Sequence, residues 1–296
     1  MGMGALGAAP LRVVCTTGMV ADMVKEVGGD RVEVTTLIGE GVDPHLFKPT
    51  RDDVSKMLKA DMIFFSGLLL EGQMIETFRK IAGRGTPVVG VADALNPGDL
   101  IQGEGHKDPH VWMDPGTWAK CIEPVRAALE KRDPEGAEGF ATRASSYRAG
   151  MEDLDAYIKK VFGSIPPEQR VLITAHDAFH YLARATGIMV LGVQGISTES
   201  EAGVSDINRL VDEIVNRKIP AIFVETSVPD KNVRAVMEGA GSRGHGLRLG
   251  GELFSDAMGA PGTYLGTYFG MIDHNATIIA RGLGGEAPEK GMAGKL

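Results

Sequence analysis

The sequence predicts an α/β fold of two lobes, each a mostly parallel sheet flanked by helices, joined by one long backbone helix. Apolar runs rich in β-branched residues alternate with amphipathic stretches along most of the chain. The pattern of the first half recurs weakly in the second, and a helix-forming stretch without strand signals separates them. With 296 residues, of which 43% are hydrophobic, each half can bury its own core.

Eight short apolar runs are the expected strands. They are residues 12–17, 32–37, 62–66, 87–91, 171–175, 189–193, 221–225 and 246–249. Stretches with helical periodicity follow most of them. They are residues 19–27, 51–59, 74–81, 118–131, 178–185, 204–217, 231–238 and 263–280.

The two halves resemble each other in places. Residues 12–29 and 170–187 both read as an Arg-led apolar strand, a Thr, a short turn and an amphipathic helix that ends in Gly. The stretches that begin at Ala60 and Ile219 also correspond. Two related lobes would explain these matches, although they are short enough for chance to remain an alternative.

Residues 133–162 are rich in Ala, Glu, Arg, Lys and Tyr, and apolar side chains recur there at helical spacing. A helix of this length would be a rod of roughly 45 Å and would hold the lobes at a fairly fixed angle. We therefore expect an N-terminal lobe over residues 11–132, a linking helix over 133–163 and a C-terminal lobe over 164–286.

The composition disfavours some partners. Asp and Glu number 39 against 31 Lys and Arg, a net charge of -8, and a nucleic acid needs a basic face instead. This acidity suits a protein that meets cations, or it only aids solubility. Two cysteines, Cys15 and Cys121, are too few for a disulfide framework or a thiolate zinc site, and we expect both to be buried. Their redox state is left open.

No stretch has the about 18 apolar residues of a membrane span. The N-terminal MGMGALGAAPLRVV lacks a basic region followed by an apolar one, the pattern of an export signal. Two interpretations stay open: a cytosolic chain, or a mature form from which a signal has been removed.

Three of the seven histidines occur in notable settings. His45 lies in GVDPHLFKPT, just past an expected strand. His110 lies in KDPHVWMDP, in the turn-rich stretch after another, and His176 directly follows the run VLITA. In parallel α/β sheets, ligands bind outside the carboxyl ends of the strands. We therefore expect these three imidazoles at ligand-binding positions.

The motif Asp-Pro-His occurs twice, at His45 and at His110. Proline fixes its own φ and biases the preceding residue towards an extended backbone, which directs the next side chain. One copy alone would favour a turn with an incidental His. Two copies, both in loops after strands, favour ligands.

Asp256 lies in GGELFSDAMGAPGT, after the last expected strand. A carboxylate in such an apolar run fits either a helix cap or a metal ligand. Taken as a ligand, it completes a set with two members from each lobe, His45 and His110 with His176 and Asp256. Imidazole suits Zn, Mn, Fe, Cu and Ni, and a carboxylate adds a hard anionic donor. The residues thus predict one divalent transition metal between the lobes.

Other polar residues have weaker signals. His180, one helical turn after His176, is expected to support the site or to be an ordinary surface residue. His106, in GEGHKD, could add a ligand but is more simply solvated. Glu199, Glu201 and Glu225 are expected in loops at strand ends, as partners for imidazole N–H groups or as solvated carboxylates.

Four segments, GVDPHLFKPT, DPHVWMDP, LITAHDAFHYL and GGELFSDAMG, resemble the metal-site segments of the zinc/manganese class of ABC-importer solute-binding proteins, especially its TroA-like branch. The likeness extends in order over residues 12–281. It implies one Zn or Mn ion, carried as cargo by His45, His110, His176 and Asp256, and delivery to a membrane ABC permease without catalysis. It also implies a periplasmic or cell-surface location, a monomer and a lipid anchor in the precursor.

The resemblance also bears on the metal. A related branch that leans towards manganese has Glu where this chain has His176, so this chain resembles the zinc-binding or mixed members. The zinc-specialised branch has a long His-rich loop before the second ligand, whereas this chain has only GEGHKDPH.

Two alternatives remain. A zinc-dependent hydrolase could use the same histidines, although it needs an open metal position and a general base. An adhesin held together by a structural metal should unfold when the metal is removed. The sequence has no GxSxG motif and no P-loop, and no GxGxxG motif follows an expected strand.

Overall fold

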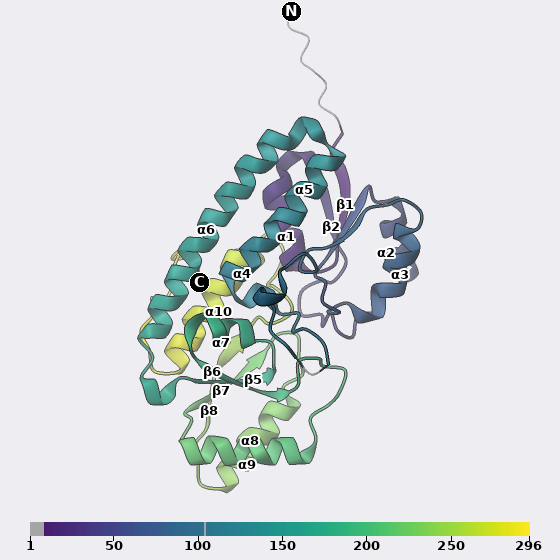
Figure 1. Ribbon diagram of the computed structural model, residues 1–296. Coiled ribbons are helices and arrows are strands. Elements are labelled where there is room, and N and C mark those ends of the chain that lie inside the picture. Colours follow the sequence, from purple (N-terminus) through teal and green to yellow (C-terminus); the bar gives the residue numbers. More distant parts are fainter. Residues whose placement is uncertain (1–8, 104) are drawn as a thin grey trace, which may run out of the picture.

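The computed structural model describes residues 9–103 and 105–296, so most of the N-terminal stretch considered for an export signal lies outside the described residues. Two lobes are stacked end to end, and one long helix runs along the side of both (Figure 1). The predicted fold class is confirmed: each lobe is built on parallel strands, with helices on both sides.

The N-terminal lobe contains a four-stranded parallel sheet in the order β2-β1-β3-β4. Its strands are β1 (Leu11–Cys15), β2 (Val32–Thr36), β3 (Met62–Phe65) and β4 (Val88–Gly90). Its helices are α1 (Gly18–Gly28), α2 (Arg51–Lys59), α3 (Ile75–Ala82), the single turn α4 (Pro115–Trp118) and α5 (Ile122–Arg132).

Both faces of this sheet are covered by helices, which explains why its central strands are apolar throughout. Val13 and Phe64 point to the side of α1 and α5 and join the main core. Val14 and Ile63 point to the opposite side, where they pack against buried residues of α2 and α3. The alternation of side chains along each strand therefore divides the lobe into two apolar layers.

The C-terminal lobe has four parallel strands in two hydrogen-bonded pairs, β5 with β6 and β7 with β8, and β5 lies beside β7. The strands are β5 (Val171–His176), β6 (Met189–Gln194), β7 (Ala221–Glu225) and β8 (Arg248–Leu253). The helices are α7 (His180–Thr186), α8 (Val204–Arg217), α9 (Lys231–Ser242) and α10 (Tyr268–Gly282). The helices α8 and α9 lie together at the outer end of the lobe (Figure 1).

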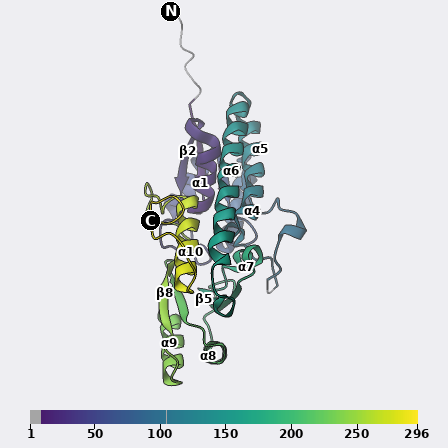
Figure 2. The same ribbon diagram turned by 90° about the vertical axis from the view of Figure 1, so that its left-hand side faces the viewer.

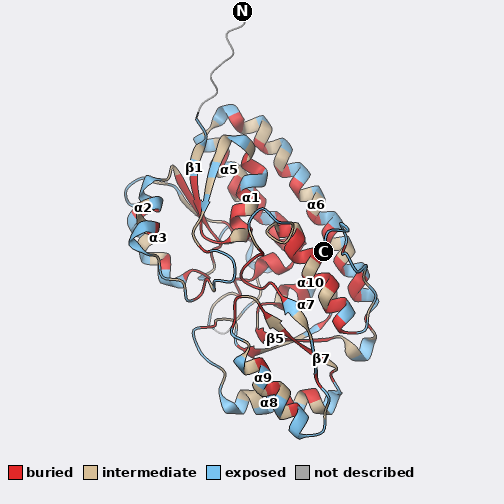
Figure 3. Ribbon diagram, turned by 180° about the vertical axis from the view of Figure 1, so that it is seen from behind, coloured by how far each residue is buried: buried red, intermediate tan, exposed pale blue. Residues whose placement is uncertain are grey.

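The long helix α6 (Ala137–Gly163) contacts both lobes through one buried stripe that includes Phe140, Met151 and Ile158. A single apolar cluster extends from Val13 in the N-terminal lobe, along α6, to Phe223 in the C-terminal lobe. Buried faces of α1, α6 and α10 turn towards one another in Figure 3. The lobes therefore share a core, and the boundaries 11–132, 133–163 and 164–286 remain a prediction.

Some element ends differ from those predicted. The last strand was expected over 246–249 but continues to Leu253, because Gly250 and Gly251 form an irregular ladder beside Phe223 instead of ending the strand. The final helix begins at Tyr268 and not at 263, because the Thr267 hydroxyl accepts a hydrogen bond from the backbone N–H of Gly270 and caps it.

The predicted helix 118–131 is divided by a 3₁₀ turn, Ala119–Cys121, before α5. The linking helix similarly begins with a 3₁₀ turn, Pro134–Gly136. As expected, Cys15 and Cys121 are buried, and they are free thiols. No helix in the described part of the chain is both long enough and apolar enough to cross a membrane.

Candidate metal centre

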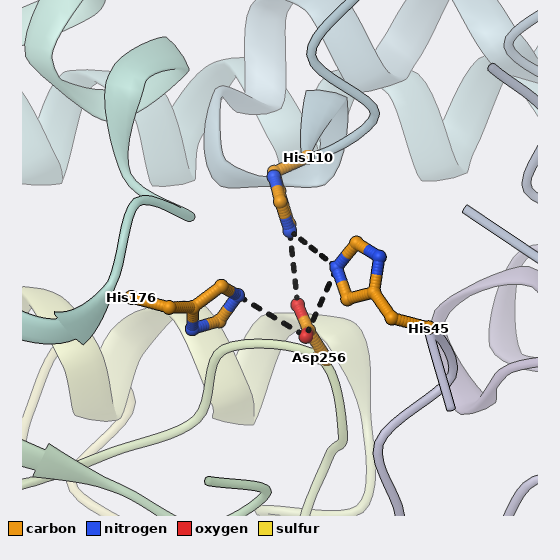
Figure 4. A group of neighbouring side chains, drawn as sticks. All are labelled: His45, His110, His176 and Asp256. Carbon is orange, nitrogen blue, oxygen red and sulfur yellow. Dashed lines mark hydrogen bonds and ion pairs between the residues drawn. The ribbon is translucent and has the colours of Figure 1, made fainter. Parts of the chain in front are cut away.

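The four side chains predicted to bind metal come together between the lobes (Figure 4). His45 lies in the loop between β2 and α2, and His110 immediately precedes a 3₁₀ turn, Val111–Met113, after the long loop that follows β4. His176 is the last residue of β5, and Asp256 lies three residues beyond the end of β8. Each lies at the carboxyl end of a strand or in the loop beyond it, as expected for parallel sheets.

The donor atoms of the four residues all lie within 4.8 Å of one another. Asp256 is at the centre: its Oδ1 lies 3.4 Å from His110 Nε2, and its Oδ2 lies 3.2 Å from His176 Nε2. His45 Nε2 is 3.7 Å from Asp256 Oδ2 and 3.3 Å from His110 Nε2. Three Nε2 atoms and one carboxylate thus face a common point.

This cluster is enclosed by protein. His110 and His176 have no exposed surface, Asp256 is 1% exposed, and His45 is 5% exposed. Among the described residues, neither the carboxylate oxygens of Asp256 nor Nε2 of His176 finds a hydrogen-bond partner. Buried polar atoms without partners are costly, and a bound ion is one of the reasons for which native proteins keep them. The helix-cap alternative for Asp256 therefore has no support, since a cap oxygen accepts from a backbone N–H.

Two of the imidazoles contact a carboxylate through Nδ1, the ring nitrogen that points away from the cluster. Asp108 Oδ1 lies 2.7 Å from His110 Nδ1 and also accepts the backbone N–H of His110. Glu225 Oε2 lies 2.5 Å from His176 Nδ1, and its Oε1 accepts the His176 backbone N–H. These contacts require Nδ1–H on both rings, so that both Nε2 atoms point into the cluster as potential donors to a metal.

The aspartates of the Asp-Pro-His motifs thus have a function that the sequence interpretation missed. Asp43 accepts the backbone N–H of His45 at 2.8 Å, just as Asp108 accepts that of His110 at 3.0 Å. An Asx turn, in which Asp bonds to the backbone two residues on, is the signal that could have revealed this. In each copy the carboxylate fixes the histidine backbone.

The other predicted polar residues separate into two groups. Glu225 supports an imidazole, and His180 Nδ1 lies 3.1 Å from Asp108 Oδ2, next to the cluster. Glu199 instead accepts a hydrogen bond from Gln73, and His106 Nδ1 lies beside the carbonyl oxygen of Lys107. Glu201 lines a separate cavity.

The charges at the site are strongly coupled. Burial lowers the pKa of His110, but Asp108 and Asp256 outweigh it and raise this pKa to about 9. Burial likewise opposes the protonation of His176, yet Glu225 and Asp256 raise its pKa well above the ordinary value. Burial lowers the pKa of His45 to about 3. The pKa of Asp256, which burial alone would raise, is held far below its usual range by His176 and His110.

This donor set matches the preferences of divalent transition metals. Three imidazoles and one carboxylate fill a tetrahedral zinc site, and a bidentate carboxylate would supply a fifth bond. The ionised Asp256 compensates part of the charge of a dication, and the buried surroundings exclude water from it. The arrangement can therefore hold one metal ion between the lobes.

Comparison with known proteins agrees with this geometry. The ZnuA family, described as "Zinc-uptake complex component A periplasmic", matches residues 13–282. The zinc-binding protein TroA of Treponema pallidum is 45% identical over 270 residues, which cover 90% of this chain and 87% of that protein. The manganese-binding lipoprotein MntA of Bacillus subtilis is 42% identical over 275 residues, covering 92% and 90% of the two chains.

Solved structures show the same similarity. The periplasmic zinc-binding protein TroA from Treponema pallidum superimposes with a TM-score of 0.90 at 44% identity, over 93% of this chain and 99% of that one. Fe(III)-bound YtgA from Chlamydia trachomatis superimposes with a TM-score of 0.84 at 28% identity, over 94% and 100%. From its sequence and its fold alike, the chain belongs to the ZnuA family of periplasmic components of zinc-uptake complexes.

Proposed function

We propose that this protein captures one divalent transition metal, zinc or manganese, outside the cytoplasm and delivers it to a membrane ABC permease. The ligands are His45, His110, His176 and Asp256. Relatives named for zinc binding and for manganese binding, several of them lipoproteins of ABC transporters, support this function. A lipid anchor in the precursor and a monomeric state are part of the proposal.

The observation that carries the proposal is the environment of Asp256. Its carboxylate is buried, faces three Nε2 atoms and has no hydrogen-bond partner in the part of the chain that the structure describes. These four donors, all within 4.8 Å of one another, could replace the hydration water of a metal ion and cage it. A carrier needs such a cage, because its cargo has to be shielded until the permease receives it.

Zinc is the metal that this donor set should bind more tightly in solution. Three neutral nitrogens and one oxygen suit the tetrahedral preference of zinc, and the general affinity order places manganese below zinc. Which metal is carried in a cell depends also on availability, so tight zinc binding is compatible with manganese transport.

Titration of chelator-stripped protein with Zn²⁺ and, separately, Mn²⁺ tests the proposal, with the stoichiometry read by native mass spectrometry. One ion per chain, with Zn²⁺ bound more tightly, is the expected result. Ions that bind without fixed stoichiometry would refute it.

The hydrolase alternative receives no support from the site. A metallohydrolase needs a general base close to an open metal position. The two buried carboxylates nearest the cluster, Asp108 and Glu225, are already engaged with imidazole nitrogens. Transport without catalysis is therefore the function that we propose.

A further inference from the structure

His110 precedes the linking helix in the sequence, but C-terminal-lobe side chains hold its segment. Tyr181 of α7 donates its hydroxyl to the carbonyl oxygen of Asp108 at 2.9 Å and accepts the backbone N–H of Ile101 at 3.1 Å. One turn further along α7, Arg184 donates to the carbonyl oxygen of Asp99 and to the hydroxyl of Thr117. His180 also contacts the Asp108 carboxylate, so one face of α7 binds the segment on both sides of His110.

A second set of contacts reaches the same segment from the Asp256 side. The indole N–H of Trp112 donates to the carbonyl oxygen of Ser255 at 2.8 Å. The hydroxyl of Tyr268, at the start of α10, donates to the carbonyl oxygen of Trp112, also at 2.8 Å. Trp112 and Tyr268 are completely buried. His110 is thereby fixed relative to both Asp256 and His176.

His45 is attached differently. Its loop continues from β2, where Leu37 and Ile38 donate backbone hydrogen bonds to Cys15 and Thr16 of the same lobe, and Phe47 packs against the outer core of that lobe. Apart from contacts within the metal cluster, one hydrogen bond in the described residues links the loop 39–50 to the C-terminal lobe. In it, the Thr198 hydroxyl donates to Asp43 Oδ2 at 2.5 Å.

The surroundings of His45 are also the most accessible. It is the most exposed of the four residues at 5%, and its neighbour Leu46 is 52% exposed. The loop between β2 and α2 contains no regular helix or strand from Leu37 to Thr50. Segments with few buried contacts open more readily than the elements that carry them.

From these contacts, and on the basis of the function proposed above, we infer that the site consists of a fixed tripod and one exchanging ligand. His110, His176 and Asp256 form the tripod, which the side chains of α7, Trp112 and Tyr268 hold together. His45 is the ligand that leaves when metal enters or exits. The Thr198–Asp43 hydrogen bond is the latch that keeps its loop closed.

This division explains how a caged ion can be released although the lobes share a core. Separation of whole lobes would break the buried apolar cluster along α6, whereas withdrawal of one loop breaks one hydrogen bond and one metal bond. A tripod that stays assembled also has less conformational entropy to lose when the next ion binds. A permease would then need to displace only the latch and the His45 loop.

The first test changes the latch. Thr198→Val removes the hydroxyl with little change in shape, and Thr198→Ser restores a hydroxyl. We expect Thr198→Val to accelerate Zn²⁺ dissociation, measured by stopped flow with excess chelator, by about tenfold or more, as loss of a hydrogen bond to a charged group predicts. Thr198→Ser should dissociate at nearly the parent rate.

The matched control is Thr142→Val on α6, which removes an exposed hydroxyl that donates to the carbonyl oxygen of Glu138 in the same helix. It should leave the rate unchanged. A dissociation rate for Thr198→Val equal to that of the parent and of this control would overturn the latch. So would equal acceleration in Thr198→Val and Thr198→Ser, since the hydroxyl would then not be the cause.

The second test compares the ligands. We expect His45→Ala to keep one Co²⁺ per chain, with a d–d absorption spectrum typical of three protein ligands plus water and a weakened affinity. His110→Ala should lose more affinity than His45→Ala, because it breaks the tripod. If His45→Ala loses as much as His110→Ala or more, the inference fails while the proposed function stands. If the parent binds no metal, the proposed function itself fails.

Discussion

The carboxylate of Asp256 faces three imidazoles and has no other partner among residues 9–103 and 105–296, so its charge is available for a metal ion. Asp256→Asn keeps the shape of the side chain and removes the charge. We expect this change to weaken Zn²⁺ binding by more than about 100-fold and to leave the fold intact. Such a loss exceeds the loss of affinity that is usual when a hydrogen-bond partner of a metal ligand is changed. Chelator competition measures the affinity, and circular dichroism checks the fold. Unchanged affinity would remove Asp256 from the site.

Glu225 acts on the metal through His176, since its carboxylate lies 2.5 Å from Nδ1 of that ring. Glu225→Gln removes the charge that makes the imidazole a stronger donor. We expect Zn²⁺ affinity to fall about 10- to 100-fold, as is usual for partners of metal-binding histidines. The control is Glu213→Gln, a surface carboxylate paired with Arg217 on α8. Equal affinities in the two variants would contradict the assignment.

Protons and metal compete for the same nitrogens. The pKa of His110 is raised to about 9 and that of His176 lies well above the ordinary value, so the metal-free site favours an extra proton on both rings at neutral pH. Zn²⁺ must displace these protons, and its apparent affinity should therefore keep rising from about pH 7 to pH 9. With an ordinary histidine pKa of about 6.5, the rise would end near neutrality.

Calorimetry in two buffers of different ionisation enthalpy measures the protons released per ion. Release of more than one proton at about pH 7 is expected from two charged imidazoles. Zn²⁺ binding that releases no protons and does not change with pH above neutrality would show that neither ring is charged before the metal binds.

At the scale of elements, α6 is the helix that packs against both lobes. Leu154 is 1% exposed and belongs to the core that the lobes share. Leu154→Ala should lower the free energy of unfolding by about 2–5 kcal/mol, because it removes buried apolar groups and leaves a cavity. Urea denaturation of the metal-free protein measures this. Glu152→Ala, at an exposed position of the same helix, should change it by less than about 0.5 kcal/mol.

The sequence predicted the elements better than their ends. Runs such as 62–66 and 221–225 are mostly apolar because helices or neighbouring strands cover them, and this pattern can be read within each run. The last strand and helix were misplaced because their ends depend on tertiary contacts, the packing of Gly250 against Phe223 and the Thr267 cap. A turn-rich stretch with Gly and Pro, 257–267, carried no sign of where helix α10 would begin.

The site was predictable to a similar extent. The repeated Asp-Pro-His and the strand-end position of His176 are local signals, and they indicated residues that the structure brings together. The hydrogen bonds between α7 and the His110 segment were not predictable. Tyr181 and Asp108 are 73 positions apart, and nothing in either segment indicates the other. Contacts of this kind decide which lobe holds His110, although sequence order assigns it to the first.

For the whole molecule, the shared core and α6 predict small rearrangements on metal loading. The metal-free protein should remain folded, and its radius of gyration from small-angle scattering should change little when Zn²⁺ binds. Loading should still raise the melting temperature, since a ligand at about 100 times its dissociation constant adds about 2.7 kcal/mol of stability. A metal-free chain that is unfolded would favour a structural metal, as in the adhesin alternative.

The position of the bound ion shows whether these four residues are its ligands. Crystals of the Zn²⁺-loaded protein, measured on both sides of the zinc absorption edge, give an anomalous difference map in which the metal appears by itself. We predict one strong peak per chain, at about 2.0–2.2 Å from Nε2 of His45, His110 and His176 and from the carboxylate of Asp256. A peak elsewhere, or no peak at this cluster, would exclude these four residues as the metal site.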